Sequence, residues 1–103
     1  MNKPRLKKIK TLANEIDELT AEILSANEDL QSLLSEEEDY HDNMPENLQY
    51  SYQGERSEEA IDVLTNGTSG IEDAIGKIEE AISSINKEVD NIFDITGDIH
   101  MLE

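Results

Sequence analysis

The chain has 103 residues, no cysteine, four aromatic side chains and a formal net charge of −17. These values exclude disulfides and thiolate metal sites, and they leave too few large apolar residues for a broad globular core. A narrow seam between helices needs only two apolar positions in seven, which 36% apolar residues can supply. A strongly negative field repels nucleic acid and attracts basic surfaces.

The first predicted element is a helix over about residues 3–40. Pro4 is tolerated in its first turn, and its interior is rich in Leu, Glu, Ala and Lys, which favour helix. Apolar residues recur along it in alternating steps of three and four, the spacing of a coiled-coil seam. This first ladder consists of Ile9, Leu12, Ile16, Leu19, Ile23, Ala26, Leu30 and Leu33.

Residues 1–10 form a basic segment with five bases and no acid, whereas residues 11–103 carry 25 acids and three bases. The segment either neutralises the acidic end of the second helix, at Asp90, Asp94 and Asp98, or binds nucleic acid as a tail. The excess of acids elsewhere favours the first interpretation. No apolar run follows the segment or is long enough to span a membrane. We therefore expect no secretory signal, no membrane contact and a location in the bacterial cytoplasm.

A connector is predicted over about residues 41–54, where Pro45 breaks the helical pattern. Asn43 and Asn47 are expected to hold the backbone of the turn. Arg56 is expected to pair with the acids of residues 36–39 across it. An ordered cap over the open end of the helix pair is predicted from four side chains: Met44, Leu48, Tyr50 and Tyr52.

A second helix is predicted over about residues 55–100. Residues 66–70 have the local composition of a loop, but the apolar ladder keeps its phase across them, which favours a continuous or slightly kinked helix. Small residues at every seventh position indicate close approach of a neighbouring helix: Ala60, Gly67, Ala74 and Ala81. The second ladder consists of Ile61, Leu64, Thr68, Ile71, Ile75, Ile78, Ile82, Ile85, Val89, Ile92, Thr96 and Ile99.

These elements predict a single all-α domain over residues 1–103, an antiparallel two-helix coiled-coil hairpin. A lone hairpin buries one seam and is marginally stable, so we expect two copies to form a four-helix bundle. Leu6, Leu24, Leu34 and Phe93 lie off the strict seam and would widen the apolar face. The predicted packing seam consists of Ile16, Leu19, Ile23, Leu30, Leu33, Ile61, Leu64, Ile71, Ile75, Ile78, Ile82 and Ile85.

No catalytic, cofactor or metal site is expected. The acids of residues 36–39 with His41 lack the twelve-residue loop of a calcium site. His41 and His100 would lie at opposite ends of the hairpin, and no nucleophile–base pair or Gly-rich phosphate loop is recognisable. The glycosylation sequon at Asn66 is interpreted as chance. The chain is therefore predicted not to be an enzyme.

The connector and its flanks combine an acidic helix end, the turn Asn-Met-Pro-Glu-Asn-Leu-Gln at residues 43–49 and an Arg-Ser-Glu helix start at residues 56–58. In these features, over about residues 30–85, the chain resembles small uncharacterised helical-hairpin proteins from bacteriophages and mobile elements of Gram-positive bacteria. The resemblance implies a helical hairpin and a phage or mobile-element context, without a particular activity. Residues 66–70 depart from the pattern of that family.

The sequence is compatible with two functions. The first is an acidic interaction protein that occupies the basic nucleic-acid-binding surface of a host protein, in the style of anti-CRISPR and anti-restriction inhibitors. Neighbouring carboxylates on a helix have axial spacings close to the roughly 1.7 Å charge spacing of DNA. The alternative is a structural assembly module that acts through its apolar seam. Direct binding of nucleic acid through residues 1–10 is disfavoured by the net charge. The partner-binding residues of the first function form the acidic tip: Glu36, Glu37, Glu38, Asp39, Asp42, Glu46, Glu55, Glu58 and Glu59.

Overall fold

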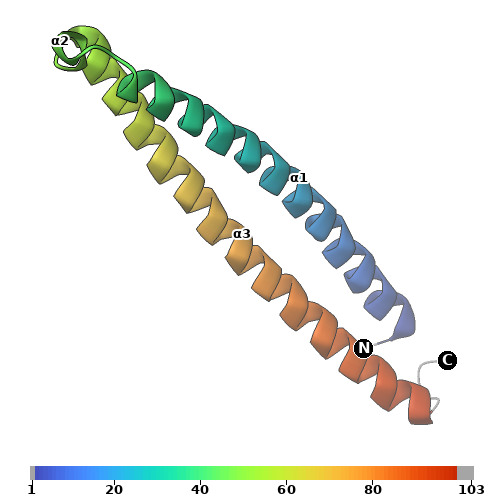
Figure 1. The fold of residues 1–103 in the computed structure, drawn as a ribbon. Coiled ribbons are helices and arrows are strands. Elements are labelled where there is room, and N and C mark those ends of the chain that lie inside the picture. Colours follow the sequence, from blue (N-terminus) through green and yellow to red (C-terminus); the bar gives the residue numbers. More distant parts are fainter. Residues whose placement is uncertain (1, 100–103) are drawn as a thin grey trace. The chain divides into compact units, whose positions relative to one another are not determined.

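The computed structural model describes residues 2–99 of the chain, and side chains from residue 2 to residue 93. Three helices occupy this range: α1 (Lys3–Asp42), α2 (Glu46–Gln49) and α3 (Tyr52–Ile99) (Figure 1). No strand occurs between residues 2 and 99, so the described chain is all-α, as the ladders predict. The connector is shorter than expected because α1 continues to Asp42 and α3 already begins at Tyr52.

The chain divides into two compact units. We call the first the terminal unit: it combines the part of α1 up to Glu22 with the part of α3 from Ile75 onwards. We call the second, Ile23–Ala74, the turn unit: it contains the rest of α1, the whole of α2 and the start of α3.

In the terminal unit, the buried residues of both helices recur at every seventh position. Seven residues are close to two helical turns, so each set lies along one line of its helix. The salt bridge between Lys10 Nζ and Asp90 Oδ1, at 2.6 Å, links the two segments beside this packed face. The α1 set has two small members and the α3 set is large and branched, which lets the α3 side chains fill the space between the helices. The buried residues are Leu6, Ala13 and Thr20 of α1, and Ile75, Ile82 and Val89 of α3.

In the turn unit, the same spacing brings two polar residues into the packed face. Asn27 is only 1% exposed, and its Nδ2 donates a hydrogen bond of 3.3 Å to the backbone carbonyl oxygen of Thr68. One turn further along each helix, Gln31 donates to the carboxylate of Glu72. Half-buried apolar residues of the same unit lie before and after these polar residues along the two helices: Leu30, Leu34, Ile61, Leu64 and Ile71.

The face of α1 that packs most closely differs from the first ladder. Leu6, predicted only to widen the apolar face, is fully buried. Leu30 is half-buried, whereas four other seam residues of α1 are exposed: Ile16, Leu19, Ile23 and Leu33. On α3, the seam residues from Ile61 to Ile82 are buried or half-buried, and Ile85 is 38% exposed. A single neighbouring helix covers only part of an apolar face as wide as that of α1.

Residues 66–70 are helical, as the phase of the second ladder predicts. The close approach predicted at Gly67 is wrong: an added Cβ would meet nothing within 4 Å there, and the same holds at Gly70. Ala74 and Ala81, which share the spacing of Gly67, are exposed as well. Gly67, Ala74 and Ala81 therefore lie on an open surface of α3, whereas Ala60, the first member of the set, is half-buried.

Candidate protein-interaction surfaces

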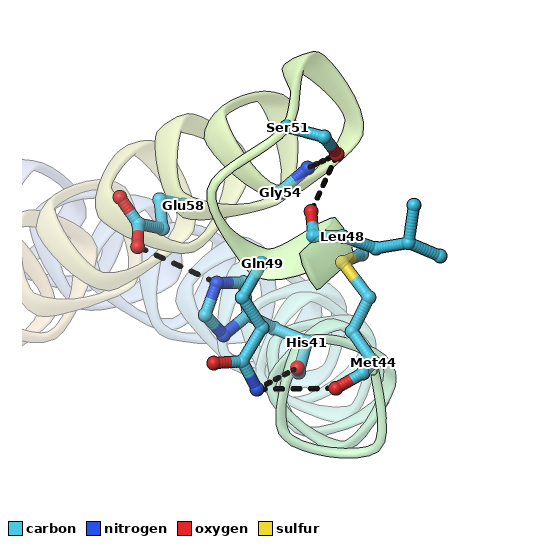
Figure 2. A network of polar contacts seen from close by, with 7 residues as sticks. All are labelled: His41, Met44, Leu48, Gln49, Ser51, Gly54 and Glu58. Atoms are coloured by element: carbon cyan, nitrogen blue, oxygen red, sulfur yellow. Dashed lines mark hydrogen bonds and ion pairs between the residues drawn. The ribbon is translucent and has the colours of Figure 1, made fainter. Parts of the chain in front are cut away.

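The turn between α1 and α3 is fixed by side chain to backbone hydrogen bonds (Figure 2). The last carbonyl groups of a helix have no partner within the helix. Gln49 Nε2 reaches back to one such carbonyl oxygen, that of His41 in the last turn of α1, at 3.4 Å, and to the carbonyl oxygen of Met44, two residues beyond the end of α1, at 3.2 Å. Ser51 Oγ donates to the carbonyl oxygen of Leu48 and accepts a bond of 3.5 Å from the backbone N–H of Gly54.

Gly54 leaves no space for a side chain. A Cβ at this position would overlap the carbonyl oxygen of Gln49 and would lie 2.6 Å from that of Leu48. Both obstacles are backbone atoms, which cannot rotate away as the end of a long side chain can. The first turn of α3 therefore lies directly against α2, and glycine is required for this contact.

His41 joins the end of α1 to the start of α3. Its Nε2 lies 3.4 Å from Glu58 Oε1, close enough for an ion pair when the imidazole is protonated (Figure 2). The same buried nitrogen has no aligned hydrogen bond among the described residues. The contact is thus an electrostatic one between a half-buried ring and an exposed carboxylate.

The ordered cap predicted for the connector is present as the one-turn helix α2, but several of the predicted contacts are wrong. In the part of the chain with described side chains, Gln49 and Ser51 bond the turn's backbone, in place of Asn43 and Asn47. Met44 is buried in the turn, whereas three other residues expected in the cap are exposed: Leu48, Tyr50 and Tyr52.

Arg56 does not pair with residues 36–39. Its Nη1 lies 3.2 Å from Glu59 Oε2, and its guanidinium carbon lies 5.3 Å from the centre of the Tyr52 ring. Residues three and four apart meet on the same helix face, so both partners come from α3 itself. Arg56 therefore provides no basic partner for the acids of residues 36–39.

The acidic tip lies entirely within the turn unit. Glu37 is half-buried and its eight other members are exposed. Residues 23–74 hold fourteen acids and one base, whereas the remaining residues of the chain hold eleven acids and seven bases. With Arg56 engaged by Glu59, the tip presents nearly uncompensated negative charge.

A second surface is apolar and lies on the outer side of α1. Most of the exposed large hydrophobic side chains belong to this helix, and Leu19 is 57% exposed. Among the aliphatic side chains of α3 that the structure describes, up to residue 93, only Val63 and Ile85 are comparable. Scattered exposed apolar residues are ordinary, but a row at steps of three and four marks an unpartnered helix face. We call this row the α1 stripe: Leu12, Ile16 and Leu19 in the terminal unit, and Ile23 and Leu33 in the turn unit.

Sequence reasoning missed the polar character of the packed face. Asn27 Oδ1, Ser57 Oγ and Asn86 Oδ1 are buried without a hydrogen-bond partner among the described residues. Ser57 lies four residues before Ile61, in phase with the second ladder, and that periodic position was a signal that could have identified it as buried. Asn27 lies seven residues after Thr20, on the buried line of α1 that the first ladder does not follow, so the ladder gave no such signal for it.

Within the described residues, no group of three His, Asp or Glu side chains is arranged to hold a metal ion. No helix in that part of the chain is both long enough and apolar enough to cross a membrane. Comparison with known proteins finds no matching family model, no matching curated protein and no matching solved structure. The acidic tip and the α1 stripe are the two features of the described residues that suggest a function.

Proposed function

We propose that this chain is a non-enzymatic, acidic interaction protein whose acidic tip binds the basic surface of a partner protein. The observation that carries the proposal is the charge of the turn unit, fourteen acids against the single base Arg56. The hydrogen bonds of Gln49 and Ser51 fix the turn, so its carboxylates start from an ordered backbone. Preorganised charge of one sign raises both the association rate and the selectivity for a surface of opposite sign.

The partner we propose is a nucleic-acid-binding protein of the host of a phage or mobile element. The basic groove of such a protein is shaped for closely spaced phosphates, and a helix with neighbouring carboxylates presents a comparable density of negative charge. Binding at this groove would compete with DNA, which is the mode of an inhibitor.

A charge-neutralised triple variant tests the proposal: Glu38→Gln, Asp39→Asn and Glu55→Gln. All three residues are exposed members of the acidic tip. The matched control removes the same charge from exposed acids of the terminal unit: Asp17→Asn, Glu18→Gln and Glu79→Gln. The readout is capture of a DNA-binding protein from bacterial lysate, its displacement by duplex DNA, and its release by salt.

We expect the tip variant to lose the capture and the control variant to retain it. Raising the salt concentration from about 0.1 M to about 1 M shortens the Debye length from about 10 Å to about 3 Å, so it should release the partner. Capture that survives high salt, or that both triple variants lose equally, would contradict recognition by the acidic tip.

The α1 stripe supports a second function, a structural assembly module. In this proposal α1 and α3 form an antiparallel coiled-coil hairpin, and two hairpins associate as a dimer into a four-helix bundle. A hairpin that leaves the five large apolar side chains of the α1 stripe exposed would be stabilised by a second apolar surface that covers them. Here the acids serve mainly solubility, and the tip variant above would leave function unchanged.

A further inference from the structure

We propose that two copies of the chain pair through their α1 stripes in antiparallel orientation. The α1 segment of the terminal unit of one copy then lies on the α1 segment of the turn unit of the other copy. This inference rests on the proposed assembly of two hairpins, and it adds which face is used, in which direction and in which register. Three features of α1 carry it: the exposed apolar row, the charges at its two ends, and the spacing of its residues.

The α1 stripe is available because the contact with α3 uses a neighbouring line of α1. The buried line runs through Leu6, Ala13 and Thr20 in the terminal unit, while Leu12 and Leu19 are exposed one position before Ala13 and Thr20. One residue is a rotation of about 100° around the helix, whereas Ile16 and Ile23, four residues before Thr20 and Asn27, lie about 40° from the buried line and are each still 44% exposed. A second helix can therefore cover the α1 stripe without displacing α3.

The charges at the two ends of α1 favour a second copy in the antiparallel direction. At its start α1 exposes Arg5, Lys7 and Lys8, and Lys10 is already engaged by Asp90. At its end α1 carries the acids of residues 36–39 and Asp42, which belong to the acidic tip. Antiparallel pairing places the basic start of each copy beside the acidic end of the other, twice across the two-fold axis. Parallel pairing would place like charges together at both ends.

The spacing of the first ladder defines the register. In antiparallel coiled coils the two seam positions of one helix alternate with those of the other. The register that fills every layer with apolar side chains pairs Leu12 with Leu30 of the second copy, Ile16 with Ala26, and Leu19 with Ile23. Two partners lie outside the α1 stripe, the exposed Ala26 and the half-buried Leu30. On the outer edge of the same register, Lys8 lies beside Glu36 of the second copy.

The register also has an unfavourable feature that makes it recognisable. It brings Glu22 of both copies together at the two-fold axis, on the outer edge of the apolar contact, and it places Glu15 beside Asp29 of the second copy on the same edge. Like charges at an exposed edge weaken an association by only a few-fold per pair, so the apolar layers outweigh them. Removing the charge of Glu22 should therefore strengthen the dimer.

The face is tested by light scattering and sedimentation over a wide range of protein concentration. Leu19→Asp places a charge in the α1 stripe, and Val63→Asp makes the same change at an exposed residue of α3. We expect the first variant to weaken the dimer at least about tenfold and the second to change it less than about twofold. Both positions are exposed, so circular dichroism should show helical chains in each case.

The outcomes separate the inference from the assembly proposal. If the unaltered chain is monomeric at every concentration, the proposed assembly fails and this inference fails with it. If the chain dimerises but Leu19→Asp has no more effect than Val63→Asp, assembly stands and the α1 face is wrong. The acidic-tip proposal is unaffected in both cases, because its readout is capture of a basic protein.

The direction is tested by disulfide cross-linking. The chain has no cysteine of its own, so only the introduced cysteines can form a disulfide. Two single variants at exposed positions are used, Lys8→Cys and Glu36→Cys. We expect covalent dimers only when the two variants are mixed before oxidation. Covalent dimers from each variant alone, and none specific to the mixture, would overturn the antiparallel direction.

The register is tested with Glu22→Gln. We expect the dimer to tighten about two- to fivefold, with Asp17→Asn, an exposed change elsewhere on α1, as the matched control. An equal effect of both variants would contradict the meeting of the two Glu22 side chains at the two-fold axis.

Discussion

Asn27 and Thr68 are joined across the turn unit by a hydrogen bond of 3.3 Å, from the side-chain Nδ2 to the backbone carbonyl oxygen. The carbonyl of Thr68 also lies within α3, where it accepts from the backbone of the helix. Asn27 Oδ1 is buried and has no partner among the described residues. The turn unit thus keeps a half-satisfied amide at a position where an apolar residue would pack.

Replacing Asn27 by leucine should therefore stabilise the fold. The substitution removes a buried unpaired oxygen, and it leaves the Thr68 carbonyl with its partner in α3. We expect the free energy of unfolding to rise by about 1–2 kcal/mol, measured by urea denaturation at one fixed protein concentration. Asn14→Leu, at an exposed position of α1, should change it by less than about 0.5 kcal/mol. Destabilisation by Asn27→Leu would show that the amide contributes more than its one bond.

Replacement of glycine by alanine should change the stability of the fold in opposite directions at two positions of α3. Gly67→Ala meets nothing within 4 Å and improves helix propensity, so it should stabilise by about 1 kcal/mol. Gly54→Ala drives a Cβ into the carbonyl groups of Gln49 and Leu48 and should destabilise by about 1–3 kcal/mol. Thermal unfolding followed by circular dichroism measures both. Equal effects at the two positions would contradict the close contact of α3 with α2.

The two amide donors of Gln49 should matter for the turn. Gln49→Glu keeps the size of the side chain but removes the donors to the carbonyl oxygens of His41 and Met44, and it adds a negative charge near the end of α1. Both changes are unfavourable at a helix C-terminus, so we expect a loss of about 1–2 kcal/mol in the free energy of unfolding.

The matched control for this change is Gln53→Glu. Gln53 is exposed in the first turn of α3, where a negative charge is favourable. We expect no loss of stability from it. A comparable loss in both variants would point to the added charge and away from the hydrogen bonds of Gln49.

Truncation to alanine should destabilise the fold by different amounts at two isoleucines of α3 in the terminal unit. Ile82 is 7% exposed, whereas Ile85, one turn later, is 38% exposed. We expect Ile82→Ala to cost about 2–4 kcal/mol and Ile85→Ala about 1 kcal/mol. Urea denaturation at one protein concentration measures the difference. Equal costs would mean that Ile85 is covered in solution by a further surface, such as a second copy of the chain.

The sequence alone was sufficient to predict two long helices, the position of the turn and the helical state of residues 66–70. These features follow from local periodicity. A row of apolar residues at steps of three and four can serve as a buried face only in a helix, and the row does not break at Gly67 or Gly70. Pro45 likewise marks the turn by a local steric effect.

The tertiary structure alone decided which line of α1 faces α3. Local spacing is equally compatible with the line through Leu6, Ala13 and Thr20 and with the line through Leu12 and Leu19, because both are regular on the same helix. The choice depends on the side chains of α3, since Ile75, Ile82 and Val89 are large and need small neighbours such as Ala13.

The contacts of the turn could not be predicted from the sequence either. Several polar side chains near Pro45 have the chemistry to cap α1, and only the path of the backbone brings Gln49 to the carbonyl oxygens of His41 and Met44. The same path presses Gly54 against α2 and leaves Arg56 with Glu59. Periodicity is a property of neighbours along the chain, whereas these contacts depend on where distant neighbours meet.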